Sequence, residues 1–233
     1  MLLCAHGVSG GPGVAERHAA AIRNAGSSAE VSACCLHGNP SLEDRLSHIE
    51  APHIRLMPLL MAEGLSHAKM ADLAASCARR LGKSISMAPA LGTAPALGRL
   101  IETCAIQAAV ERNWRPQDTG LLLVGHGTRR NAESAESLRL QTAGIAARGG
   151  FGEVRHALIE ADPLPHAVLN TFSATKLIAV GFFLDGGIHG EIDVPACLSG
   201  FAGEAVYTGP IGSDPGIPRI ILDLLETRSR AVA

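Results

Sequence analysis

Aromatic residues and clusters of one charge are scarce in this chain. Phe, Trp and Tyr together make up 3% of the 233 residues, and the formal net charge is -2, without a long run of Lys and Arg. Nucleic-acid binding draws on a positively charged surface, and single strands also require aromatic rings on which bases can stack. We therefore expect no nucleic-acid partner.

Long apolar runs and closely spaced cysteines are also missing. No apolar stretch reaches the roughly 18–20 residues that a membrane-spanning helix needs. The short apolar run Leu2–Ala5 has no charged segment before it, so it is interpreted as a strand and not as a signal peptide. The six cysteines include no C-x-x-C pair, which argues against a zinc knuckle or an iron–sulfur cluster. These absences predict a cytoplasmic protein without a membrane partner.

An internal repeat is the main positive feature of the sequence. Matching segments keep the same order along the chain and are separated by an almost constant 120 to 123 residues. The matches are His6-Gly7 with His126-Gly127, Pro40 with Pro163, His67 with His189, and Leu91–Pro95 with Ile211–Pro215. Such regularity indicates two copies of one ancestral unit.

Strands and helices are expected to alternate in each copy. The apolar runs predict strands near 2–5, 29–36, 53–61 and 84–88, and again near 121–124, 154–159, 177–184 and 205–208. This alternation predicts an α/β fold of two tandem Rossmann-like (flavodoxin/chelatase-like) domains. Each would hold a four-stranded parallel sheet flanked by helices, with a pseudo-two-fold axis between the domains. The polar stretch 113–119 places the domains at 1–115 and 118–233.

The repeated histidines follow strands in both copies. His6 and His126 follow the first strand of their copies, and His67 and His189 follow the third. Ligands of open parallel sheets bind beyond the carboxyl ends of the strands. Imidazole binds first-row metal ions and, with an ordinary pKa of about 6.5, accepts protons near neutral pH. The pattern therefore predicts a site that handles a metal ion or protons.

Two other interpretations of the first loop fit the residues less well. The glycines at 7, 10, 11 and 13 do not match the spacing G-x-G-x-x-G, and the second copy lacks them, so a dinucleotide loop is not expected. The His-Gly pair is locally similar to phosphohistidine-type phosphatases. Those enzymes carry Arg directly before the His, whereas this chain has Ala5 and Gly125.

Longer motifs resemble a known family. Leu-Leu-Val-Gly-His126-Gly-Thr, the proline turn after the second strand, and the pattern G-x-x-H-x-x-x-D-[IV]-P within Phe182–Pro195 are similar to the class II tetrapyrrole chelatases. They look most like the long, tandem-repeat form of the sirohydrochlorin cobalto- and ferrochelatases. The resemblance covers nearly the whole chain and is strongest over 120–195.

The resemblance implies a lyase that inserts a divalent metal into sirohydrochlorin, giving siroheme, or cobalt-sirohydrochlorin for cobalamin. Fe²⁺ or Co²⁺ would be a substrate, and no cofactor would stay bound. Some cobalt-inserting relatives carry a histidine-rich segment that this chain lacks, which slightly favours Fe²⁺. A non-catalytic carrier of tetrapyrrole or metal is the alternative. Short members of the family pair as homodimers, so the tandem chain is expected to be a monomer.

Site residues follow from the same resemblance. It implies catalytic and metal-binding roles for His126 and His189, and we add Glu63 and Glu191 as further candidate metal ligands. Lys69 stands in the first copy at the offset that Glu191 has in the second, so we expect the second copy to hold the active site. The predicted substrate-binding residues are Thr128, Arg129, Arg130, His67 and Asp193.

Overall fold

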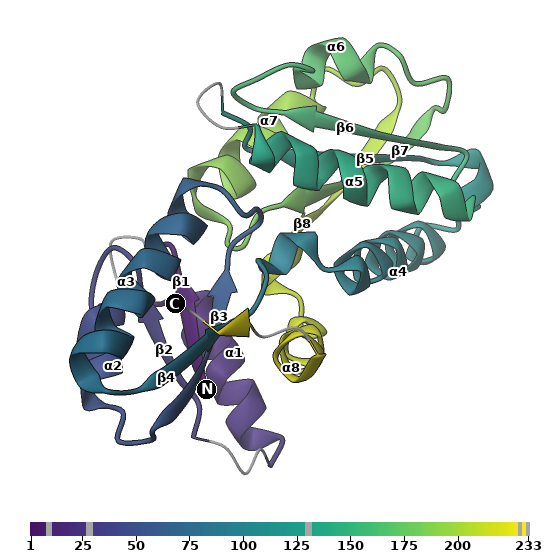
Figure 1. The fold of residues 1–233 in the computed structure, drawn as a ribbon. Coiled ribbons are helices and arrows are strands. Elements are labelled where there is room, and N and C mark those ends of the chain that lie inside the picture. Colours follow the sequence, from purple (N-terminus) through teal and green to yellow (C-terminus); the bar gives the residue numbers. More distant parts are fainter. Residues whose placement is uncertain (8–10, 27–29, 129–131, 228–229, 232–233) are drawn as a thin grey trace. The chain divides into compact units, whose positions relative to one another are not determined.

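Two compact units make up the chain in a computed structural model that describes residues 1–7, 11–26, 30–128, 132–227 and 230–231 (Figure 1). The first unit combines Met1–Ala94 with Pro215–Ala233, and the second is Pro95–Asp214. Each unit is a parallel sheet with helices on both faces. The predicted α/β architecture of tandem four-stranded parallel sheets is confirmed.

The first unit has the strand order β2-β1-β3-β4-β9. Its parallel strands are β1 (Leu2–Ala5), β2 (Ser32–Cys35), β3 (His53–Leu59) and β4 (Ser84–Met87), and β9 (Arg230–Ala231) adds antiparallel to β4. One face is covered by α1 (Val14–Asn24) and α8 (Ile217–Thr227), and the other by α2 (Leu42–His48) and α3 (Leu65–Leu81). A single 3₁₀ turn, η1 (Leu91–Thr93), follows β4.

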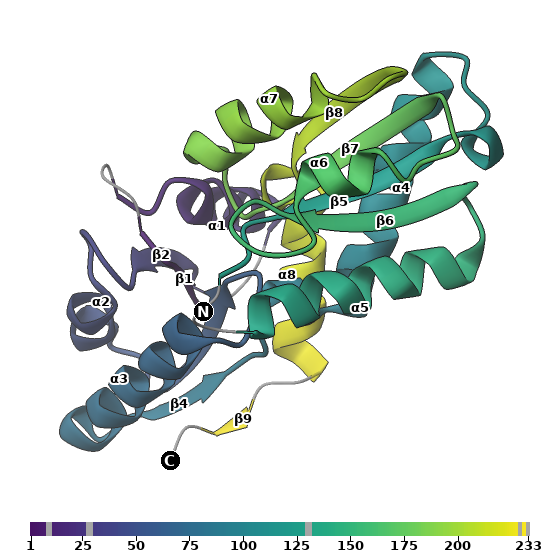
Figure 2. The ribbon, with the colours of Figure 1, turned by 90° about the horizontal axis from the view of Figure 1, so that it is seen from above.

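The second unit has the order β6-β5-β7-β8, with all neighbours parallel (Figure 2). Its strands are β5 (Gly120–Gly125), β6 (Glu153–Leu158), β7 (Lys176–Phe182) and β8 (Glu204–Pro210). One face carries α4 (Pro95–Glu111) and α5 (Glu133–Arg148), and the other carries α6 (Pro165–Leu169) and α7 (Val194–Leu198). The shorter turns are η2 (Pro116–Asp118), η3 (His189–Asp193) and η4 (Ile211–Ser213).

Burial on both faces explains the apolar strands. All six residues of β5 are buried, as expected for a central parallel strand that is covered by helices on each side.

No helix within the described residues is long and apolar enough to cross a membrane.

The last helix of each sequence copy belongs to the compact unit of the other copy. Helix α4 follows β4 along the chain but packs against α5, β7 and β8, and α8 follows β8 but packs against α1 and β3. The apolar face of α4 is fully buried at Leu97, Ile101 and Ala105. The predicted domains, 1–115 and 118–233, correspond to the two sequence copies. The compact units differ from these ranges, because each contains the last helix of the other copy. Helical periodicity shows that a helix has an apolar face but does not say which sheet that face covers.

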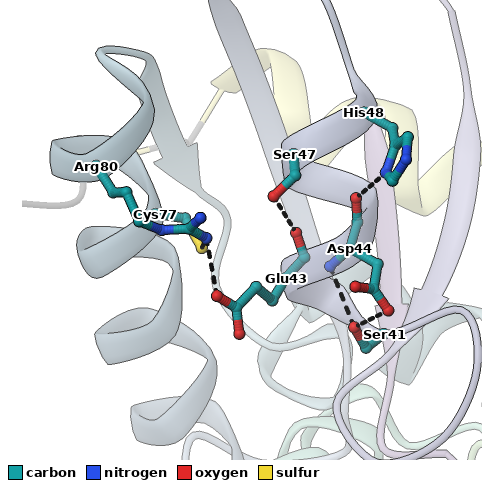
Figure 3. A network of polar contacts seen from close by, with 7 residues as sticks. All are labelled: Ser41, Glu43, Asp44, Ser47, His48, Cys77 and Arg80. Atoms are coloured by element: carbon teal, nitrogen blue, oxygen red, sulfur yellow. Dashed lines mark hydrogen bonds and ion pairs between the residues drawn. The ribbon is translucent and has the colours of Figure 1, made fainter.

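An ion pair joins helices α2 and α3 of the first unit, and further polar contacts lie within α2 and its cap (Figure 3). Ser41 caps α2 by accepting a hydrogen bond from the Asp44 amide at 3.1 Å, and its hydroxyl donates to Asp44 Oδ2 at 2.6 Å. Glu43 pairs with Arg80 of α3 at 2.8 Å. An exposed pair of this kind contributes about 0–1 kcal/mol. The main contact of α2 is therefore its buried apolar face, at Leu42 and Leu46.

The helix exchange predicts which fragments fold. A fragment of residues 95–214 keeps α4 over β7 and β8, whereas residues 118–233 lack this cover. Ile178 and Val180, which alternate with the core residues of the α7 face, would then be exposed. We expect the first fragment to unfold cooperatively in urea, followed by circular dichroism, and the second to aggregate or to bind a hydrophobic dye. Equal behaviour of the two fragments would contradict this assignment.

Candidate metal centre

Glu160 is brought beside His126 by backbone hydrogen bonds that follow the last paired residues of β5 and β6. The Ile159 amide donates to the Gly125 carbonyl at 3.0 Å, and the Glu160 amide donates to the His126 carbonyl at 2.9 Å. These two hydrogen bonds hold the residues after β6 against the residues at the end of β5. The His126 Nδ1 and Glu160 Oε2 atoms are consequently 3.7 Å apart.

Gly127 allows this close approach. Its φ is +69°, and a Cβ there would lie 2.8 Å from the Leu158 Cβ. A side chain would meet both an unfavourable backbone conformation and the wall of the neighbouring strand. The Gly of the His-Gly motif is therefore explained by the backbone that it must adopt, while the His supplies the chemistry.

His189 approaches from the turn after β7. It opens the π-helical turn His189–Asp193, which leads directly into α7. Pro195 has no N–H to donate to a carbonyl in the preceding turn, which favours a wide turn at this point. The Nδ1 atom of His189 lies 2.7 Å from Asp193 Oδ2. The wide turn thus places an imidazole and a carboxylate that holds it on one side of the same short element.

Three potential metal ligands converge at this edge of the sheet. One ligand atom from each of His126, Glu160 and His189 lies within 4.8 Å of the other two. The two imidazole rings meet edge to face, with centroids 4.5 Å apart. Within the described part of the chain, this is the single group of three or more such side chains.

The hydrogen bonds of the two rings leave the same nitrogen available on each. Nδ1 of His189 faces the Asp193 carboxylate, and Nδ1 of His126 faces the Gly127 carbonyl. Both partners accept hydrogen bonds, which favours the tautomer with the proton on Nδ1 and a lone pair for a metal ion on Nε2. A carboxylate behind a metal-binding imidazole also raises the basicity of that ligand. Three protein ligands leave coordination positions open, as in sites that exchange their metal or act on a substrate.

The predicted carboxylates Glu63 and Glu191 are not part of this group. Glu63 lies in the first unit, where its Oε1 accepts a hydrogen bond from the Ala90 amide at 3.3 Å. Glu191 is exposed in the π-helical turn, and its carboxylate lies next to Gly186. Burial of the phenol and, to a lesser extent, the charge of Glu191 raise the pKa of Tyr207 to about 12.

The predicted substrate-binding residues have different positions. Asp193 is bonded to His189, and Thr128 directly follows the His-Gly turn and is partly exposed. Arg129 and Arg130 lie outside the described residues. His67 lies in the first turn of α3 in the first unit, and its Nε2 is buried without a hydrogen-bond partner in the described structure.

Glu160 is the residue of the cluster that sequence reasoning missed. It belongs to no short motif, and it is distant in sequence from both histidines. The signal that could have identified it is its place two residues after the second strand and three residues before Pro163, the proline of the repeat. Parallel pairing of the first two strands brings that position next to His126.

The fold and this site define a tandem α/β protein that presents a histidine–carboxylate cluster, able to hold a metal ion, at the carboxyl edge of one of its sheets. The chain belongs to the CbiX family, whose profile matches residues 1–108 and 120–228. It is 25% identical, over 263 aligned residues, to a Halobacterium salinarum protein described as a probable sirohydrochlorin cobaltochelatase. That alignment covers 96% of this chain and 89% of the relative.

Solved structures share the fold. The structure of CbiX described as the terminal enzyme for biosynthesis of siroheme in denitrifying bacteria matches with a TM-score of 0.76 and 23% identity, over 97% of each chain. SirB from Bacillus subtilis with Fe³⁺ matches with a TM-score of 0.76 and 16% identity, over 97% of this chain and 93% of that one.

The close approach at Gly127 leads to a prediction with a matched control. Gly127 and Gly149 have the same φ of +69°, but a Cβ at 149 would have nothing within 4 Å. Gly149→Ala should therefore lose only the strain of the left-handed conformation, about 1 kcal/mol. Gly127→Ala adds overpacking against Leu158 and should lose about 1–3 kcal/mol more. Urea denaturation of both variants measures the difference, and equal losses would show that the contact with Leu158 is unimportant.

The hydrogen bond from His189 to Asp193 leads to a second prediction. Asp193→Asn removes the charge behind the imidazole and should weaken Co²⁺ binding by about 10- to 100-fold, as is usual when the partner of a metal-binding histidine is changed. Asp72→Asn, which alters an exposed carboxylate on α3, is the control and should leave binding unchanged. Isothermal titration calorimetry gives the Kd values. An unchanged Kd for Asp193→Asn would show that metal binding does not depend on the contact between His189 and Asp193.

Proposed function

We propose that this chain is a sirohydrochlorin chelatase that inserts Fe²⁺ or Co²⁺ into the tetrapyrrole, with its working site in the second copy. The observation that carries the proposal is the convergence of His126, Glu160 and His189 at the carboxyl edge of a parallel sheet. Membership of the CbiX family and the activities for which the relatives are named support the same conclusion.

The cluster matches the charge balance of metal insertion. A divalent ion enters the macrocycle as two pyrrole N–H protons leave it, so the site must release an ion and accept protons. Imidazole and carboxylate bind a first-row ion, and both regain a basic lone pair when that ion leaves. His126, His189 and Glu160 would thus exchange the metal ion for protons without a separate base.

The exposure of the cluster suits a large flat substrate. The side chains of His126 and Glu160 are 44% and 52% exposed, and that of His189 is 33% exposed. A resident structural ion is usually enclosed by four protein ligands, whereas these side chains face solvent on the open side. A macrocycle could therefore meet an ion held at this edge directly.

Binding of the substrate carboxylates is assigned to the loop after His126. Thr128 offers a hydroxyl, and Arg129 and Arg130 offer the charges that would pair with several carboxylates of the macrocycle. The two arginines lie outside the described residues, so their role rests on the sequence alone.

The choice between iron and cobalt rests on a narrower argument. Two imidazoles and one carboxylate suit Fe²⁺ and Co²⁺ alike. The missing histidine-rich segment slightly favours Fe²⁺, and with it siroheme as the product. Among the relatives, the Halobacterium protein is named for cobalt and the SirB structure contains Fe³⁺.

The proposed inequality of the two copies predicts the activities of single variants. His126→Ala, His189→Ala and Glu160→Gln should each lose most of the turnover of sirohydrochlorin, because each removes a ligand of the cluster. His6→Ala and His67→Ala should each keep a substantial fraction. The measurement is an anaerobic assay with Fe²⁺ and with Co²⁺ that follows the absorption bands of the tetrapyrrole, with circular dichroism as the check on folding.

Two outcomes would overturn this assignment. If His6 and His67 proved essential while His126 and His189 were dispensable, the working site would lie in the first copy. If the unmodified protein bound the macrocycle without accelerating metal insertion by either ion, it would be a carrier and not an enzyme.

A further inference from the structure

The first unit repeats the backbone of the metal centre with different side chains. The Leu36 amide donates to the Ala5 carbonyl and the His37 amide donates to the His6 carbonyl, both at 2.9 Å. These bonds correspond to those that Ile159 and Glu160 make in the second unit. His37 therefore occupies the position that Glu160 has in the metal centre.

The third position of the cluster also differs. The Gly92 amide donates to the Leu60 carbonyl, as the Gly212 amide donates to Phe183, so the end of β3 matches the end of β7 at an offset of 123. This offset aligns His189 with Ser66, whereas the helices after the two strands begin at Leu65 and Gly187, an offset of 122 that aligns it with His67. The side-chain contact favours Ser66, whose Oγ lies 3.2 Å from His6 Nδ1. The cluster is thus His-Glu-His in the second unit and His-His-Ser in the first.

The charges around the first-unit cluster also differ from those around the metal centre. His37 stands in place of the Glu160 carboxylate, and Lys69 follows Ser66 by one turn of α3. The first turn of α3 holds no acidic residue, and no side chain caps its amides. Partial burial, the His37 ring and the Lys69 charge, in that order, lower the pKa of His6. Such a place disfavours a further cation and favours an anion.

We infer that the cluster of His6, His37 and Ser66, together with Lys69, binds an oxyanion of the carboxylate or phosphate type. The rings of His6 and His37 are in edge-to-face contact with centroids 5.1 Å apart, and both are exposed enough to reach a ligand. Imidazole N–H groups, a hydroxyl and an ammonium group are all donors, and an oxyanion accepts from each of them. The amides at the start of α3 add a positive end to the same place. This site belongs to one unit and does not depend on the proposed activity.

The anion site can be tested in the full chain by NMR of the histidine rings. Titration with inorganic phosphate, and separately with acetate, at an ionic strength held constant with chloride, should shift the ring signals of His6 and His37 with saturation. Lys69→Met should weaken the binding by about tenfold, since it removes a charged donor. Arg79→Met removes the same charge about 15 Å further along α3, beyond the screening length, and should have little effect.

The source of the anion is distinguished by a third titration with metal-free sirohydrochlorin. Shifts with phosphate or acetate indicate a free oxyanion, and shifts with the macrocycle alone indicate its carboxylates. Either result supports the site. The absence of saturable shifts with all three probes, or equal weakening by Lys69→Met and Arg79→Met, would overturn it.

A second experiment tests whether these three side chains set the ligand preference. In a His126→Ala/His189→Ala background, the first unit should bind no Zn²⁺ by calorimetry. Adding His37→Glu and Ser66→His restores the metal-binding set, and should create Zn²⁺ binding and abolish the response to phosphate. If the His126→Ala/His189→Ala variant itself bound Zn²⁺ at His6, the native cluster would be a metal site. A folded quadruple variant without Zn²⁺ binding would show that the three positions do not converge as proposed.

Discussion

In each unit the two residues after the second strand stay hydrogen-bonded to the backbone at the end of the first strand, and the side-chain cluster depends on these bonds. In the second unit it sets Glu160 beside His126, and in the first it sets His37 beside His6. The chain must then turn away at once, which requires a glycine with positive φ. At Gly7 a Cβ would lie 1.8 Å from the His37 carbonyl oxygen, so the constraint is at least as severe as at Gly127. The His-Gly pair occurs in both copies because the backbone makes this close contact in both units.

The two units present different side chains on similar backbones, and the opposite ligand preferences that we propose rest on this difference. The positions after the first, second and third strands carry His, Glu and His in one unit and His, His and Ser in the other. A carboxylate attracts a divalent ion and also takes part in proton transfer, whereas an imidazole and a hydroxyl beside a lysine offer hydrogen-bond donors. Because the backbone hydrogen bonds are the same in both units, the difference lies in the side chains. In the proposed assignment, duplication allows one copy to hold a metal site while the charge of the other copy differs.

The exchanged helices affect how each sheet is buried. The face of β7 and β8 is covered by α4, which comes from the end of the first sequence copy, and β3 is covered in part by α8 from the end of the second. Each compact unit is thus completed by a segment from outside its own copy. The apolar face of α4 would have no cover of its own if the copies were separated at the polar stretch 113–119.

Much of this protein follows from local sequence patterns. The apolar runs determined the eight main strands, with ends that agree within a few residues, because a strand buried on both faces leaves an uninterrupted apolar signal. The repeat determined the tandem sheets, and the resemblance of the longer motifs pointed to His126 and His189, which the structure brings together. Asp193 is part of the same motif, four residues after His189.

Tertiary structure decided which residues and segments became neighbours, and no local sequence pattern predicts this. Glu160 is separated from His126 and His189 by other strands and helices, and only the register of parallel strands makes these residues neighbours. In the first unit the Ser66 hydroxyl lies within hydrogen-bond distance of His6, although His67 gives the better sequence match to His189. Helices α4 and α8 have clear apolar faces, but the sheet that each one covers depends on which path the connecting chain takes. In every case the sequence specifies the chemistry of a side chain or the character of a segment, and long-range packing specifies what lies beside it.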